Sequence, residues 1–142
     1  MLLSLLVALD ITHAPGPIRI PKDKLVRKGE IEGFGDVAEG LKAARRANLP
    51  VMMVFWAACE PWRAIERGAL CDSDVVKVSK RFVVIFVDTN QDKAAVQTYK
   101  IRAVPKVLFL KPDGAIEMEF MGTGAAHHYL DAMLRVLKIL GR

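Results

Sequence analysis

The sequence predicts an α/β sandwich of three layers around a central mixed sheet. Two apolar runs, 51–57 and 82–87, contain no polar residue and are typical of strands that are buried on both faces. Segments with apolar residues at helical spacing precede, separate and follow these runs, which favours helices packed on a sheet. Two later strands, 107–110 and 115–121, are joined by a stretch of turn-forming residues. They predict an antiparallel pair, so the sheet is mixed.

Residues 1–30 are predicted to form an apolar arm and a loop that precede a domain spanning 31–142. The run 1–9 is apolar but too short to span a membrane. It resembles a signal-peptide remnant with a cleavage site at 12–14, although it lacks a basic n-region. The alternative is an arm that packs on the body of the protein. The breaker cluster 14–17 separates this run from the rest of the chain.

The segment between the arm and the first buried strand contains one predicted helix. Residues 18–20 alternate in polarity and fit a short edge strand, whereas 21–35 is polar and glycine-rich and is interpreted as a loop. Asp36 and Glu39 form a capping-box pattern, which predicts that a helix begins there. This helix ends before Pro50, which leads into the strand.

The later elements are predicted from the same kinds of signal. A helix is predicted after Cys59, because Pro61 is favoured in a first helical turn. Asp72 then caps a second helical segment before the next strand. The remaining predicted elements are a helix starting at 88–90, a strand at 107–110, a turn at 111–114, a half-exposed strand at 115–121 and a final amphipathic helix with its apolar stripe in 130–140.

The composition indicates one soluble globular domain. The chain has 142 residues, of which 52% are hydrophobic and 26% are charged, too apolar for a disordered chain. The net charge of +5 comes from basic residues that are spread along the sequence in short pairs at most. Since nucleic-acid binding usually needs a clustered basic stripe, we expect a solvated basic surface and no nucleic-acid partner.

The two cysteines exclude a disulfide scaffold and a zinc site. A helix joining Cys59 to Cys71 would separate them by about 18 Å, whereas a disulfide needs Cα atoms within about 7 Å. The two thiols are therefore predicted to be free unless the helix breaks at Gly68. Cys71 has no positional signature and is interpreted as structural. The adjacent His127 and His128 would diverge on a helix, so no metal site is predicted.

Cys59 is the strongest candidate for a reactive residue. It lies where a buried strand turns into a helix, and the free N–H groups of a helix N-terminus favour the nucleophilic thiolate. Glu60 acts in the opposite direction, because a neighbouring carboxylate disfavours a second negative charge. The alternative is a buried, inert cysteine, the commonest state of a free thiol in proteins.

The residues around Cys59 carry a family resemblance. Phe55-Trp56-Ala57 followed by Cys59-Glu60-Pro61-Trp62 resembles the active-site segment of the thioredoxin-like superfamily, which has Phe-Trp-Ala, two further residues and Cys-Gly-Pro-Cys. The resemblance covers about 36–140. Its other matching features, in order, are the strand ending at Asp88, the segment from Tyr99 to Pro105, the strand and turn in 107–114, and Gly122 before the last helix.

Three departures from the family pattern bear on the chemistry. Trp62 replaces the second cysteine, and Val54 replaces the buried acid that the family carries before its tryptophan. One residue fewer lies between Ala57 and Cys59. Without a second thiol, a mixed disulfide on Cys59 has no internal route of release.

The resemblance implies a substrate-binding surface around Cys59. It implies that Pro105 is a cis proline packed against Cys59, and that Val104 offers backbone hydrogen bonds to an extended substrate. The implied contact residues are Trp56, Glu60, Pro61, Trp62, Val104 and Pro105.

Two functions therefore remain open. The first is a monothiol thiol–disulfide exchange protein that acts through Cys59 on protein or small disulfides and uses glutathione or another external thiol, with no bound cofactor. The second is a redox-inactive binding module, in which Trp56 and Trp62 form an aromatic patch beside the groove at Pro105. We expect a monomer with no membrane span, and an extracytoplasmic location is favoured over a cytoplasmic one.

Overall fold

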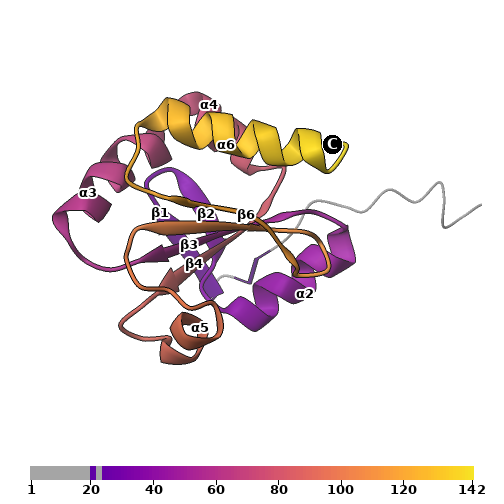
Figure 1. Cartoon of the computed structure of the whole chain (residues 1–142), viewed down its shortest axis with the longest axis horizontal. Coiled ribbons are helices and arrows are strands. Elements are labelled where there is room, and N and C mark those ends of the chain that lie inside the picture. Colours follow the sequence, from indigo (N-terminus) through magenta and orange to yellow (C-terminus); the bar gives the residue numbers. More distant parts are fainter. Residues whose placement is uncertain (1–19, 22–23) are drawn as a thin grey trace, which may run out of the picture.

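The computed structural model of the chain describes residues 20–21 and 24–142, so the predictions for the apolar arm lie outside the described residues. A six-stranded sheet forms the centre of the described part (Figure 1). Its strands, in spatial order, are β1 (Leu25–Lys28), β2 (Ile31–Phe34), β4 (Val83–Asp88), β3 (Val51–Trp56), β5 (Lys106–Leu110) and β6 (Ile116–Met121).

The pairing around β3 makes the sheet mixed. β3 runs parallel to β4 over six residue pairs, beginning with Val51 opposite Val83. On its other side β3 runs antiparallel to β5, with Val51 opposite Leu110. β6 then pairs antiparallel with β5. The predicted mixed sheet is therefore confirmed, with the two unbroken apolar runs as its central strands.

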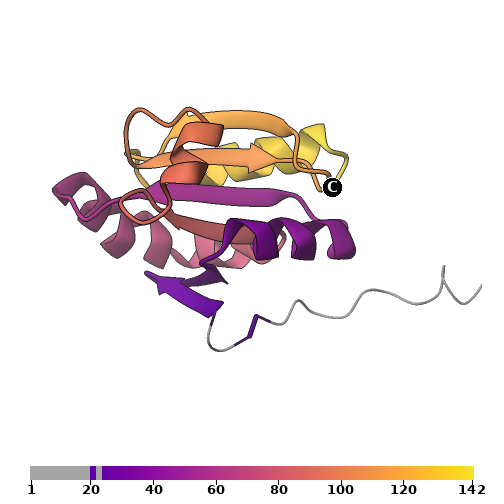
Figure 2. The same ribbon diagram turned by 90° about the horizontal axis from the view of Figure 1, so that it is seen from below.

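Helices cover both faces of this sheet, so the three predicted layers are confirmed (Figures 1 and 2). Met52 and Val54 of β3 point into a core beneath α3, α4 and α6, whereas Met53 and Phe55 point into a core beneath α2 and α5. The helices are α2 (Val37–Ala47), α3 (Glu60–Arg67), α4 (Ser73–Ser79), α5 (Lys93–Thr98) and α6 (Ala126–Ile139), with a 3₁₀ turn η2 (Ala69–Cys71).

The stretch 21–35, predicted to be a loop, contains the hairpin of β1 and β2. Lys28 pairs with Ile31, and the turn between them uses Gly29 at φ 59°. Each strand has only four residues, with charges among them, so no alternating pattern marks them; burial of Ile31 and Phe34 in the two cores stabilises them. β1 therefore belongs to the sheet, although it was expected to lie in a loop.

Helix starts agree with the capping signals at two places and differ at a third. The Asp36 carboxylate accepts a hydrogen bond from the Glu39 N–H at 3.1 Å, and Asp72 caps α4 in the same way. The helix expected from 88–90 instead begins at Lys93, with Asp92 as its cap. The reason is that Asp88 closes a local turn by accepting the N–H of Asn90.

Candidate functional site

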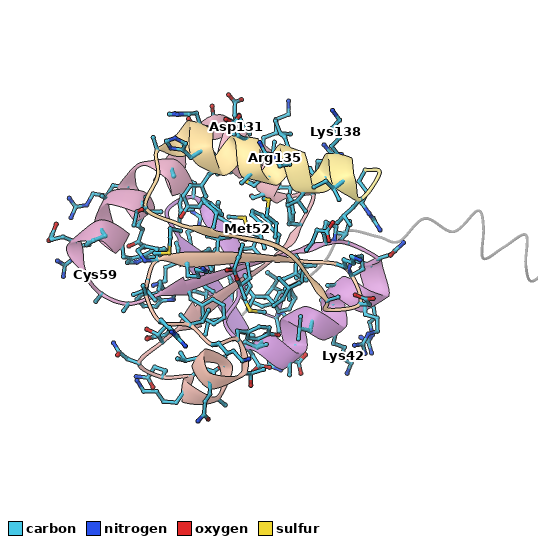
Figure 3. The ribbon with its side chains drawn as sticks, viewed as in Figure 1. Lys42, Met52, Cys59, Asp131, Arg135 and Lys138 are labelled. Atoms are coloured by element: carbon cyan, nitrogen blue, oxygen red, sulfur yellow. The ribbon has the colours of Figure 1, made fainter. Side chains whose placement is uncertain are left out.

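Cys59 occupies the N-cap position of α3, directly beyond the end of β3. Its backbone is extended, its carbonyl accepts the Arg63 N–H at 3.0 Å, and Pro61 stands in the first turn. The Cys59 side chain is half-buried and makes no capping hydrogen bond. Both cysteines are free, and α3 does end at Gly68. The helix thus presents one thiol at an end of the molecule (Figure 3).

The two tryptophans stack on one another beside Cys59. Their ring centroids are 5.6 Å apart with an interplanar angle of 27°. The Lys28 ammonium lies 3.7 Å from the centroid of the Trp56 ring, a cation–π contact. Trp62, with 2% of its surface exposed, belongs to the core beneath α3, against which Trp56 and Cys59 pack. These contacts form the apolar surface against which Cys59 packs.

The β1–β2 turn is fixed to the helical segment that comes after Cys59. The Glu30 N–H donates to the Leu70 carbonyl at 2.8 Å, and a Cβ added at Gly29 would lie 2.7 Å from the Glu66 carbonyl oxygen. Only glycine therefore lets the turn approach α3 this closely. This attachment holds Lys28 over Trp56.

The Val104–Pro105 peptide bond is cis and lies at the same edge of the sheet as the end of β3. Register decides this placement, because Phe55 pairs with Lys106 across the two antiparallel strands. Directly after the neighbouring strand β4, the Thr89 hydroxyl and N–H both donate to the Trp56 carbonyl. Three strand ends thus converge at the edge that carries Cys59.

Gly122 links Pro105 to α6 through two hydrogen bonds. Its N–H donates to the Pro105 carbonyl at 2.9 Å, and its own carbonyl accepts the Tyr129 hydroxyl at 2.7 Å. Tyr129 is fully buried. One hydrogen-bonded chain therefore connects α6 to the cis peptide.

The polypeptide shares its architecture with solved thiol–disulfide proteins. A thioredoxin from Thermus thermophilus superposes with a TM-score of 0.65 at 24% sequence identity, over 72% of this chain and 84% of that chain. The chain has a thioredoxin-like fold.

Two further solved structures support the assignment. A DsbH oxidoreductase gives a TM-score of 0.66 at 12% identity, over 91% of this chain and 97% of that chain. A disulphide isomerase from Xylella fastidiosa Temecula1 gives a TM-score of 0.61 at 22% identity, over 70% of this chain and 87% of that chain. No protein-family model and no curated protein matches the sequence.

The predicted contact residues of this thioredoxin-like domain differ in their exposure. Glu60 and Pro61 are exposed, and the Glu60 carboxylate forms an ion pair with Arg63 at 2.7 Å. Trp56 and Val104 are half-buried, and Pro105 is buried. The surface beside the thiol is therefore formed by Glu60, Pro61 and the outer parts of Trp56 and Val104.

The interpretation of Trp62 as part of an exposed aromatic patch is wrong. Trp62 shares a helix face with Ile65, and that face packs on the sheet, so the indole is buried where the thioredoxin-like pattern has its second cysteine. Cys71, interpreted as structural, is exposed, and its Sγ donates to the Glu66 carbonyl at 3.3 Å.

The core beneath Cys59 is apolar. Val54 is fully buried, and none of the buried side chains of the described residues is a carboxylate. No acid therefore lies beneath the thiol in this part of the chain. The described residues also contain no group of three or more metal-ligating side chains. None of the helices they form is long and apolar enough to cross a bilayer.

Sequence reasoning missed the roles of Lys28, Thr89 and Tyr129. Lys28 belongs to the hairpin in 21–35, where the sequence predicts a loop. For Thr89 the sequence suggests only a helix start, and Tyr129 has no motif around it. An aromatic residue seven positions after a glycine is no signal by itself, because the hydrogen bond between them depends on the tertiary fold.

Replacing Tyr129 with phenylalanine should destabilise the protein by about 1–3 kcal/mol, because the buried Gly122 carbonyl loses its donor. Burial raises the pKa of Tyr129 above its ordinary value of 10.0. The folded state then keeps a proton that the unfolded state releases, so stability falls as the pH rises above 10.0. Urea unfolding near neutral pH and above pH 10.0 measures both effects.

The phenylalanine variant should lose less stability than the parent protein on going to the alkaline pH. Tyr99, whose pKa is also raised by burial, is present in both proteins and supplies the same background. An equal alkaline loss in parent and variant would contradict the assigned role of the Tyr129 hydroxyl.

Proposed function

We propose that the protein carries out thiol–disulfide exchange through the single thiol of Cys59. The observation that carries the proposal is the position of this free, half-buried thiol at the N-cap of α3, beside the edge that holds the cis peptide before Pro105. Reactive cysteines of disulfide oxidoreductases occur at helix N-termini, which supports the proposal.

In the proposed reaction the Cys59 thiolate attacks one sulfur of a disulfide. A new bond forms between Cys59 Sγ and that sulfur, the substrate S–S bond breaks, and its second sulfur leaves as a thiolate. An external thiolate such as glutathione then attacks the sulfur bonded to Cys59 and regenerates the free cysteine. Each step exchanges one disulfide for another, so no bound cofactor takes part.

Two features support an external rather than an internal second step. Trp62 fills the position of a resolving cysteine and carries no thiol. Val54 occupies the core beneath it, where no carboxylate is available to take a proton. The substrates are therefore proposed to be protein or small-molecule disulfides that bind across Glu60, Pro61 and Val104.

Oxidised glutathione tests the proposal directly. In a Cys71→Ser background we expect one glutathione to attach to Cys59, and the adduct should persist until a free thiol is added. A Cys59→Ser variant that keeps Cys71 is the matched control, because Cys71 is exposed but lacks the N-cap position. Peptide mapping by mass spectrometry should show Cys59 reacting at least about tenfold faster than Cys71, because a helix N-terminus is a position at which reactive cysteines occur.

A rate on Cys59 no greater than that on Cys71 would overturn the proposal. The second candidate, a redox-inactive binding module, would then be the better description. Its predicted groove has less support, since both Trp62 and Pro105 are buried.

A further inference from the structure

The fold gathers basic side chains that are scattered in the sequence. β3 and β4 begin at one edge of the sheet, where Val51 lies opposite Val83, and β5 ends there at Leu110. Exposed cations flank each of these strand ends. We call this cluster the basic end, and it consists of Arg45, Arg46, Lys80, Arg81, Lys111 and Lys138.

α6 also ends at this edge. The Arg142 guanidinium donates to the Asn48 backbone carbonyl and, at 3.2 Å, to the Asn48 Oδ1 atom, which joins the end of α6 to the end of α2. Along the long axis of the molecule, Cys59 and Lys138 lie toward opposite ends (Figure 3). The basic end and the candidate site therefore face in opposite directions.

Helix dipoles account for only part of the cluster. Arg45, Arg46 and Lys138 lie in last helical turns, where a cation is favoured by the dipole. Lys80, Arg81 and Lys111 lie beyond helix or strand ends. All the ion pairs of the described residues involve other cations, so the charge of the basic end is not neutralised within the described part. Asp113 is the acid in the adjoining turn, and its carboxylate accepts the Ala115 N–H.

Apolar groups accompany these charges. Leu134 and Ile139 of α6 are 43% and 57% exposed, and Ile139 is adjacent to Lys138 in the sequence. Ile20 lines a cleft of about 760 Å³ together with Leu49 and Lys80, so the chain enters its described part next to the basic end. Glu30 and Glu32 line the same cleft and pair with Arg27.

We propose that the basic end binds the surface of an anionic lipid bilayer. Anionic headgroups attract Lys and Arg clusters, and adjoining apolar residues insert at the boundary of headgroups and acyl chains. Cys59 then faces away from the membrane. The alternative of a single-stranded nucleic acid needs exposed stacking aromatics, whereas Trp56 and Trp62 lie at the other end.

Vesicle flotation with the full chain tests the proposal. We expect binding to vesicles of phosphatidylcholine with phosphatidylglycerol, and at least tenfold weaker binding to pure phosphatidylcholine. The triple variant Lys80→Gln, Arg81→Gln, Lys111→Gln should bind the anionic vesicles about tenfold to a hundredfold more weakly, because each cation near the surface contributes. Salt of about 1 M, which screens charges beyond about 3 Å, should weaken binding of the unaltered chain.

The matched control removes the same charge elsewhere. Arg67, Lys93 and Arg102 are exposed, and changing all three to glutamine should leave vesicle binding within about twofold. The proposal would be overturned if both triple variants weakened vesicle binding equally, or if the unaltered chain showed no preference for anionic vesicles. It would also be overturned if the chain bound a single-stranded RNA more tightly than vesicles.

A second readout tests the orientation. A water-soluble maleimide should alkylate Cys59 on vesicle-bound protein at a rate within about twofold of that in solution, in the Cys71→Ser background. Strong protection of Cys59 by vesicles would show that the site end faces the lipid and would overturn the assigned orientation. None of these readouts requires exchange activity, so the lipid proposal and the proposed function fail independently.

Discussion

Replacing Trp62 with cysteine should convert a persistent mixed disulfide on Cys59 into one that is released without an external thiol. Positions 59 and 62 are three residues apart at the start of α3. Two cysteines at this spacing form the Cys-X-X-Cys motif, whose thiols pair in disulfide oxidoreductases. The new thiolate would attack Cys59 Sγ, release the substrate thiol and leave an internal disulfide.

The substitution also removes a buried indole. Truncation of a buried tryptophan costs roughly 3–5 kcal/mol, and the stacking with Trp56 is lost as well. Trp62→Ser is therefore the matched control, because it creates a similar cavity without a thiol. Mass spectrometry should show that a preformed glutathione adduct is released completely from the cysteine variant and is not released from the serine variant. Equal persistence in two folded variants would show that α3 does not place residue 62 within reach of Cys59.

Much of the fold could be predicted because its central strands are unbroken apolar runs. Such runs identify buried strands without any tertiary information, and the acids Asp36 and Asp72 mark helix starts by local chemistry alone. The hairpin of β1 and β2 lacks both signals. Its strands are short and charged, and they are stable because Ile31 and Phe34 are covered by distant parts of the chain.

The position of the candidate cysteine was predictable, but its surroundings were only partly so. A strand followed by Cys59 and Pro61 is a local pattern, and the structure has Cys59 at the N-cap. The exposure of Trp62 depends on the orientation of the whole helix. The contact of Lys28 with Trp56 depends on a turn that touches α3 through Gly29. No local pattern specifies such contacts.

The basic end illustrates the same limit for surface charge. Arg46, Lys80 and Lys111 are more than thirty residues apart in the sequence, so they do not form a charged run. The alternation of helices and strands returns each of them to one edge of the sheet. Basic residues that look dispersed in a sequence can therefore form one surface.

Replacing Gly122 with alanine should weaken both stability and exchange, although Gly122 lies outside the Cys59 segment. A Cβ at this position would lie 2.6 Å from the Tyr129 hydroxyl oxygen, 3.1 Å from Pro105 Cβ and 3.3 Å from Val107 Cγ2. Tyr129 and Val107 are fully buried, so neither side chain can move into solvent. Overpacking of this kind costs about 1–3 kcal/mol, and loss of the Tyr129 hydrogen bond adds about 1–3 kcal/mol.

A double-mutant cycle isolates the cause of this effect. Tyr129→Phe removes the oxygen with which the new methyl group would clash. The free energy of unfolding should therefore fall less in the double variant, Gly122→Ala with Tyr129→Phe, than the sum of the losses in the two single variants. Urea unfolding gives the free energies. The contact with Pro105 Cβ remains in the double variant, so the rate of glutathione attachment to Cys59 should stay below that of Tyr129→Phe alone. Additive free energies would mean that the new methyl group does not act through the Tyr129 hydroxyl. A normal attachment rate in the double variant would mean that Gly122 does not position the cis peptide for the reaction at Cys59.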